Sequence, residues 1–224
     1  MKKSILGLAF ASLVSATQAM SADYDVTITN VTSGSIFTPI YVISHKPGIK
    51  LFELGHPASS ELAAIAEGGD FSSLATSLQG DSRVVDTADS AALLADSGGL
   101  LLPGASVTVT VRAPNGPGQV SLASMMLPTN DGFIALNGVD VPRNERTVSY
   151  YSPGYDAGSE PNDELCVSIP GGGPCGGGQG GSPGAGGEDY VHIHSGIHGI
   201  GDLSSSDHDW RNPTAYITIK RVKN

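Results

Sequence analysis

The chain has 224 residues and a formal net charge of −10, with 22 acidic against 12 basic side chains. A surface this negative repels phosphate backbones, which argues against nucleic acid as a partner. Charged residues make up only 15% of the chain and 30 residues are glycine, a composition typical of exported β-rich domains rather than cytosolic helical ones.

The first residues are typical of an export signal. A basic start is followed by an apolar run at residues 5–14, which is too short to span a bilayer. Thr17-Gln-Ala19 is a suitable signal-peptidase site, and cleavage after Ala22 is the second choice. We therefore expect a signal peptide at residues 1–19, a secreted or periplasmic protein, and no transmembrane segment in the mature chain. An N-terminal membrane anchor is the alternative.

Alternating apolar and polar residues predict strands along most of the chain. Residues 24–31 are the first example, because Tyr24, Val26 and Ile28 would share one face. The strand at residues 119–127 is mostly apolar, which indicates a central position in its sheet. The other predicted strands lie at residues 38–44, 106–111, 133–136, 146–151 and 214–222.

The most helical part lies between these strands. Two serines precede residues 61–67, in which Leu62, Ile65 and Ala66 share one face before two glycines stop the helix. Asp70 is a candidate cap for a second short helix that runs to Leu78. We expect residues 81–99 to continue this helical insertion, with a helical turn at 90–95.

Runs of strands with helices confined to one insertion predict an all-β fold, a mainly antiparallel β-sandwich. One domain would occupy residues 23–223. The Gly/Pro-rich tract at residues 170–187 cannot bury a core and is expected to be a mobile loop. Cys166 and Cys175 lie beside it, and export permits a disulfide between them. Metal binding by the cysteines, or two free thiols, are the alternatives.

Two turns beside apolar strands contain acidic residues. Asp131 lies in Asn-Asp-Gly and Asp156 lies in Tyr-Asp-Ala-Gly. Carboxylates on adjacent loops commonly hold a hard cation such as Ca²⁺, and Glu160 could wrap around the same ion. The alternative is that both aspartates only cap turns. Glu160 would then belong, with Asp163 and Glu164, to a solvated acidic loop.

Three histidines form a second candidate metal site. His192 and His194 are two positions apart, so they share one face of a strand, and His198 follows a glycine-containing turn. Three imidazoles could bind Zn²⁺ or Cu²⁺. The alternative is that these histidines only form hydrogen bonds within a turn-rich region.

Several segments form a distinctive series along the chain. They are Tyr24–Asn30, Val42–His45, Phe52–Ser59 with the Ala-rich helix at 61–67, Met125–Asp131 with Phe133–Asn137, and Tyr155–Gly158. In this order they resemble the spondin domain of F-spondin, mindin and secreted bacterial proteins, over roughly residues 24–222. The resemblance implies a β-sandwich, secretion and a Ca²⁺ site at one end.

The resemblance also implies a role in adhesion, and it implies which residues bind the Ca²⁺ ion. Asp131 and Asp156 match the family's Ca²⁺ ligands, whereas Gly132 stands where the animal members have an aromatic residue. The expected partner is a surface or matrix protein or a glycan. Animal partners such as integrins do not transfer, because this chain has no room for the accompanying thrombospondin-type repeats.

The sequence contains no recognised catalytic motif: Gly-x-Ser-x-Gly, His-Glu-x-x-His and a phosphate loop are all missing. We therefore expect a non-catalytic protein. Two other function classes remain open. One is an exported transition-metal binding protein or metalloenzyme that uses His192, His194 and His198. The other is a purely structural protein of an envelope or biofilm matrix.

Overall fold

The structure, a computed structural model, describes residues 21–114, 116–171, 173–176 and 186–223. The predicted signal peptide and residues 177–185 of the Gly/Pro-rich tract lie outside the described residues. Ala22 lies inside the first strand, opposite Ala113. Cleavage after Ala19 would leave this strand whole, and cleavage after Ala22 would remove its first pairs.

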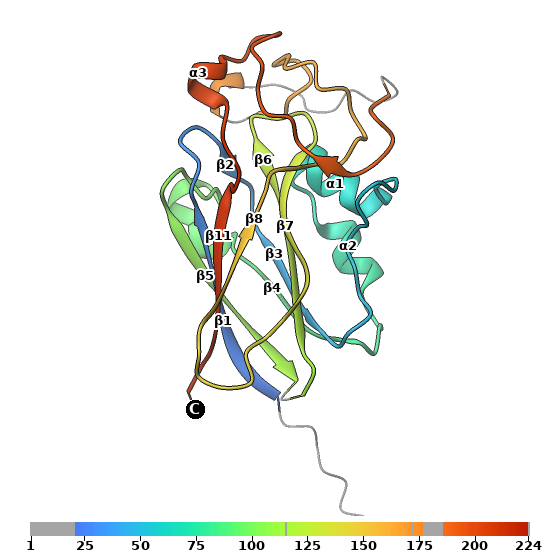
Figure 1. The fold of residues 1–224 in the computed structure, drawn as a ribbon, viewed down its shortest axis with the longest axis vertical. Coiled ribbons are helices and arrows are strands. Elements are labelled where there is room, and N and C mark those ends of the chain that lie inside the picture. Colours follow the sequence, from blue (N-terminus) through green and yellow to red (C-terminus); the bar gives the residue numbers. More distant parts are fainter. Residues whose placement is uncertain (1–20, 115, 172, 177–185, 224) are drawn as a thin grey trace, which may run out of the picture.

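Two antiparallel sheets form the molecule (Figure 1). The smaller sheet has the order β5-β1-β11-β8. It consists of β1 (Ser21–Asn30), β5 (Ser106–Pro114), β8 (Val148–Ser152) and β11 (Ala215–Arg221). The larger sheet has the order β10-β9-β7-β6-β3-β4, and β2 pairs with β6 beside this path. It consists of β2 (Ile36–Phe37), β3 (Tyr41–His45), β4 (Val84–Asp89), β6 (Gln119–Leu127), β7 (Gly132–Asp140), β9 (Tyr155–Asp156) and β10 (His192–Ile193). The predicted all-β antiparallel sandwich is therefore confirmed.

The main core lies between the two sheets. On β1 the predicted alternation holds, because Tyr24, Val26 and Ile28 are buried while the residues between them are half-buried. They pack in one cluster with Leu122 and Met125 of β6. Strand β6 is buried on both faces, since helix α1 (Ser60–Gly68) covers its other side. A second apolar cluster under this helix contains Leu62, Ala66, Phe133, Ala135, Ala157 and Val191.

The helical insertion begins as the sequence predicts. Ser59 caps α1 by accepting a hydrogen bond from the Leu62 N–H, and Leu62, Ile65 and Ala66 face the core. Gly69 ends the helix with a left-handed φ of 68°. A Cβ there would lie 2.9 Å from the Thr38 side chain, so the position requires glycine. The remaining helices are α2 (Ser72–Ser77), the 3₁₀ turns η1 (Ala92–Ser97) and η2 (Gly173–Cys175), and α3 (Ser205–His208).

The prediction for residues 81–99 is wrong in part, because β4 occupies residues 84–89 in place of a helix. This strand pairs with β3, and its residues are mostly half-buried without an alternating pattern. The strand conformation of residues 84–89 therefore depends on pairing with a distant strand, and no local sequence pattern indicates it. The strand predicted at 38–44 is also displaced, since β3 begins only at Tyr41.

The loops that follow β6 and β8 and those on both sides of β10 gather at one end of the sandwich, opposite the C-terminus (Figure 1). This end, hereafter the loop end, comprises residues 128–131, 153–171, 173–176 and 186–210. It carries both predicted acidic turns and the histidine segment. Within the described part of the chain, no helix is long and apolar enough to cross a membrane.

Candidate metal centre

The turn between β6 and β7 presents Asp131. Thr129 organises this turn, because its Oγ1 accepts a hydrogen bond from the Gly132 N–H at 2.9 Å and donates one to the Met126 carbonyl. A Cβ on residue 132 would lie 2.5 Å from Thr129 Oγ1. Gly132, at which this chain departs from the animal pattern, is therefore built into the turn that positions Asp131.

Strand β9 places Asp156 beside this turn. Asp156 pairs with Gly132 across the β7–β9 ladder, and the Ala157 N–H donates to the Asp131 carbonyl at 3.2 Å. The side chains of both aspartates are completely buried. Two residues that are 25 positions apart in sequence thus become neighbours inside the loop end.

The carboxylate of Asp131 is only half satisfied by hydrogen bonds. Its Oδ2 accepts from the Ser159 N–H at 2.8 Å, the Glu160 N–H at 3.0 Å and the Ser159 hydroxyl at 3.2 Å. Its Oδ1 is buried and has no hydrogen-bond donor among the described residues. One carboxylate oxygen therefore keeps its lone pairs available inside the protein.

The electrostatics of the aspartate pair are unfavourable for two anions. Burial and the nearby charge of Asp156 raise the pKa of Asp131 to about 6, although the N–H groups of Ser159 and Glu160 lower it. Among the described residues, no lysine or arginine nitrogen lies within 4.0 Å of either carboxylate. The arrangement concentrates negative charge where water does not screen it.

The other acidic residues of this segment are not a solvated loop. Glu160 is 2% exposed and Glu164 is 3% exposed. Glu164 has a structural role, because its carboxylate accepts hydrogen bonds from three consecutive backbone N–H groups, those of His198, Gly199 and Ile200. Asp163 is held by the Asn130 amide, the Leu165 N–H and the Ser168 hydroxyl. The segment that follows Asp156 therefore wraps the site and anchors the histidine loop.

Two of the three predicted histidines lie against Asp156. His192 Nδ1 is 3.8 Å from Asp156 Oδ1, and His194 Nε2 is 3.9 Å from Asp156 Oδ2. Their spacing of two residues puts both rings on this side, as strand geometry predicts. His198 is exposed, and its Nε2 lies 3.2 Å from the Ser195 hydroxyl.

Sequence reasoning missed two residues of this region. Asp156, Glu188 and His192 each offer a ligand atom, and these atoms all lie within 4.8 Å of one another. Asn162 bridges the two acids, because its amide donates to Asp156 Oδ2 at 2.7 Å and to Glu188 Oε1 at 3.3 Å. The polar run at 160–164 could have indicated Asn162. Glu188 has no such signal, since it follows the Gly/Pro-rich tract.

A comparison with known families identifies the family of this chain. The Spondin_N family model matches residues 18–160, which is more than half of the 224-residue chain. The chain belongs to the Spondin_N family. The match includes Asp131, Asp156 and Glu160 but ends well before residue 222, to which the resemblance was expected to extend. No curated protein matches the chain.

Membership of the Spondin_N family indicates a cellular location and a general class of protein. Spondin domains are extracellular and generally non-catalytic. The predicted disulfide between Cys166 and Cys175 is confirmed, and such bonds persist in oxidising compartments. Both observations support an exported spondin-type module.

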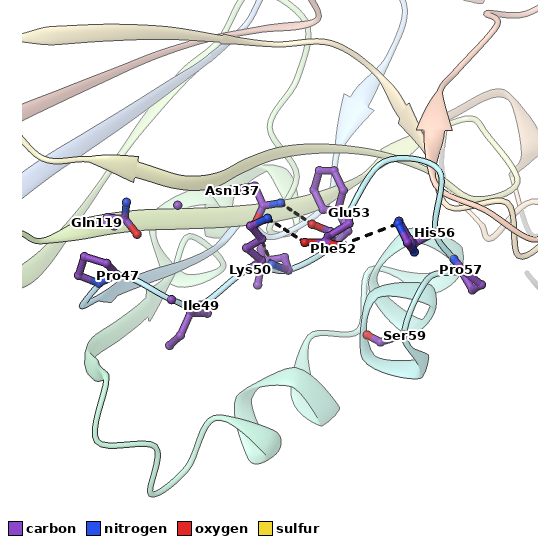
Figure 2. A pocket seen from close by; sticks show the side chains of 13 residues that line it. Pro47, Ile49, Lys50, Phe52, Glu53, His56, Pro57, Ser59, Gln119 and Asn137 are labelled. Carbon is purple, nitrogen blue, oxygen red and sulfur yellow. Dashed lines mark hydrogen bonds and ion pairs between the residues drawn. The ribbon is translucent and has the colours of Figure 1, made fainter.

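This spondin domain also has a surface groove of about 640 Å³ beside the segment 47–59 (Figure 2). Asn137 fastens that segment, because its amide accepts from the Leu51 N–H and donates to the Phe52 carbonyl. Lys50 and Glu53 pair with each other at 2.8 Å. These polar groups of the lining already bond within the protein, so the groove offers a cation weaker ligands than the acidic pair does.

Proposed function

We propose that this spondin domain is a secreted, non-catalytic module that binds Ca²⁺ at Asp131 and Asp156 and attaches to a surface or matrix protein or a glycan. One observation carries the proposal. Two fully buried carboxylates lie together, and one of them has an oxygen atom without a hydrogen-bond donor.

A hard cation fits this site chemically. Burying a carboxylate without a partner costs several kcal/mol, and a second carboxylate nearby increases that cost. A divalent cation removes both penalties, and Ca²⁺ prefers oxygen ligands, including backbone carbonyls of the same turns. Asp131 Oδ1 is free to coordinate, and Glu160 is buried in the segment that wraps Asp131. These are the residues that would hold the ion.

Binding would fix the loop end as a recognition surface. Asp131 lies between β6 and β7, Asp156 belongs to β9, and Glu160 begins the segment that leads to the disulfide. Several large apolar side chains are exposed on the same loops, which is typical of surfaces that contact other molecules. They are Leu165, Val167, Tyr190, Ile193 and Ile200.

Thermal melting of the chelator-treated protein tests the Ca²⁺ site. A ligand at a hundred times its Kd stabilises a folded protein by about 2.7 kcal/mol, which raises Tm by roughly 5–10 °C for a domain of this size. We expect this rise in the wild type and its loss in Asp131→Ala and Asp156→Ala. Asp207→Ala is the matched control, because Asp207 is an exposed carboxylate of the same loop end. Identical melting curves with and without Ca²⁺ would refute the proposal.

Attachment is tested separately, by binding of the protein to arrays of immobilised glycans and matrix proteins. We expect binding that a chelator weakens and that Asp131→Ala weakens equally. Binding that is indifferent to both changes would assign recognition to a surface unrelated to the acidic pair.

A further inference from the structure

A second candidate cation site shares Asp156 with the acidic pair but does not include Asp131. Its members are Asp156 of β9, Glu188 of the segment after the Gly/Pro-rich tract, and His192 of β10. Glu188 and His192 lie beyond the residues that the family model matches. This site is therefore a feature of this chain's own C-terminal region.

The geometry is already close to that of a bound ion. The three ligand atoms lie within 4.8 Å of one another, and Asp156 Oδ1 is 3.8 Å from His192 Nδ1. Ligands of one tetrahedral Zn²⁺ are about 3.3 Å apart, so small side-chain movements would close the set. Glu188 is exposed and His192 is partly exposed. Glu188 accepts from the Asn162 amide at 3.3 Å and His192 Nδ1 lies 3.1 Å from the Tyr190 carbonyl oxygen, and ion binding would replace these contacts.

His194 is an independent sign that a buried polar group beside Asp156 has no partner among the described residues. Its side chain is 2% exposed, and its Nε2 has no hydrogen-bond partner although it lies 3.9 Å from Asp156 Oδ2. The Gly196 N–H donates to Nδ1, so a neutral ring carries its proton on Nε2. His194 thus directs an unused donor at Asp156, which is how a second layer of residues orients a metal-binding carboxylate.

The chemistry of the donors selects the kind of ion. Imidazole nitrogen is a ligand for first-row transition metals and a poor one for Ca²⁺. Two carboxylates and one imidazole suit Zn²⁺ and its neighbours, and the exposed side of the cluster leaves room for water. The two cysteines do not compete for the ion, because they form the disulfide.

We propose that Asp156, Glu188 and His192 bind a first-row divalent transition metal, of which Zn²⁺ is the test ion. Asp156 is shared with the Ca²⁺ site, but Asp131 and Glu160 have no part in this one. A bound ion would fasten residues 188–192 to β9 and add a cross-link between the sheet and the C-terminal part of the loop end. His198 is outside the proposed ligand set.

Calorimetric titration of metal-free protein with Zn²⁺ tests the inference. We expect one equivalent bound by the wild type, with an affinity at least tenfold weaker in Glu188→Gln and in His192→Ala. His198→Ala and Asp207→Ala are the matched controls and should bind Zn²⁺ like the wild type, because both residues are exposed at the loop end. Glu188 is exposed, so its variant stays informative even if His192→Ala does not fold.

Three outcomes would overturn the inference. One is a wild type that binds no Zn²⁺. Another is unchanged affinity in Glu188→Gln and His192→Ala, which would indicate an adventitious surface site. The third is a loss of Zn²⁺ affinity in His198→Ala as large as in His192→Ala, which would show that His192, His194 and His198 together bind the ion. Melting of Glu188→Gln with Ca²⁺ separates the two metal sites, because its Ca²⁺ response should equal that of the wild type.

Discussion

At the scale of single residues, Asp131 is where the energetics of folding and the proposed function conflict. Its carboxylate accepts three hydrogen bonds on one oxygen and none on the other, in a fully buried position. Such an arrangement stabilises the folded state poorly unless a cation completes it. The turn chemistry around Asp131 explains why Gly132 follows it, since Thr129 occupies the space that a side chain would need.

Replacing Asp131 by asparagine should stabilise the metal-free protein. The pKa of Asp131 in the folded protein, about 6, lies above the ordinary value of 3.8. Below about pH 4 the carboxyl group is largely protonated and has little effect on stability. Above pH 6 its ionisation inside the folded protein lowers the free energy of unfolding by up to roughly 3 kcal/mol. In chelator at pH 7.5, Asp131→Asn should melt above the wild type, and the difference should vanish near pH 4. A variant that melts below the wild type at both pH values would contradict this account of the site.

At the scale of elements, the sequence predicts well those elements whose conformation depends on neighbouring residues. The prediction of helix α1 is correct because its cap, its apolar face and its terminal glycine all lie within the eleven residues from Ser59 to Gly69. Strand β4 was missed because its conformation depends on pairing with β3, about 40 residues earlier. The same limit holds in the site: turn residues indicated Asp131 and Asp156, whereas the approach of Glu188 depends on how the distant C-terminal segment folds back.

The pairing of β3 with β6 should make stability depend on pH through His45. This ring is fully buried, with Nε2 2.9 Å from the Ser121 hydroxyl and Nδ1 2.8 Å from the Lys46 carbonyl. Burial lowers its pKa below 6.5, and the charges of Arg83 and Asp81 act in opposite directions. The unfolded chain thus binds a proton more readily, and stability falls as pH drops below 6.5.

The measurement is the loss of Tm between pH 7.5 and pH 5 in the wild type and in His45→Gln. We expect a smaller loss in the variant, whatever its Tm at pH 7.5. Equal losses in both proteins would show that other groups govern the acid response.

At the scale of the whole molecule, the strands of the sandwich and the loop end differ in part in the interactions that stabilise them. The strands below are packed through a continuous apolar core. The loops above have buried carboxylates and a disulfide, and they add Ile169, Ile197, Leu203 and Trp210 to the same apolar cluster. Cations at the loop end would add cross-links between these loops to that packing, and the exposed apolar side chains there would be presented in a fixed arrangement.

A crystal of the protein grown with Ca²⁺ tests the central claim most directly, through the anomalous scattering of the ion. The account predicts a peak within 2.3–2.6 Å of oxygen atoms of both Asp131 and Asp156. Asp131→Asn crystals grown in the same way should lack it. A map without a peak at the acidic pair, at Ca²⁺ concentrations that saturate known sites, would contradict the account.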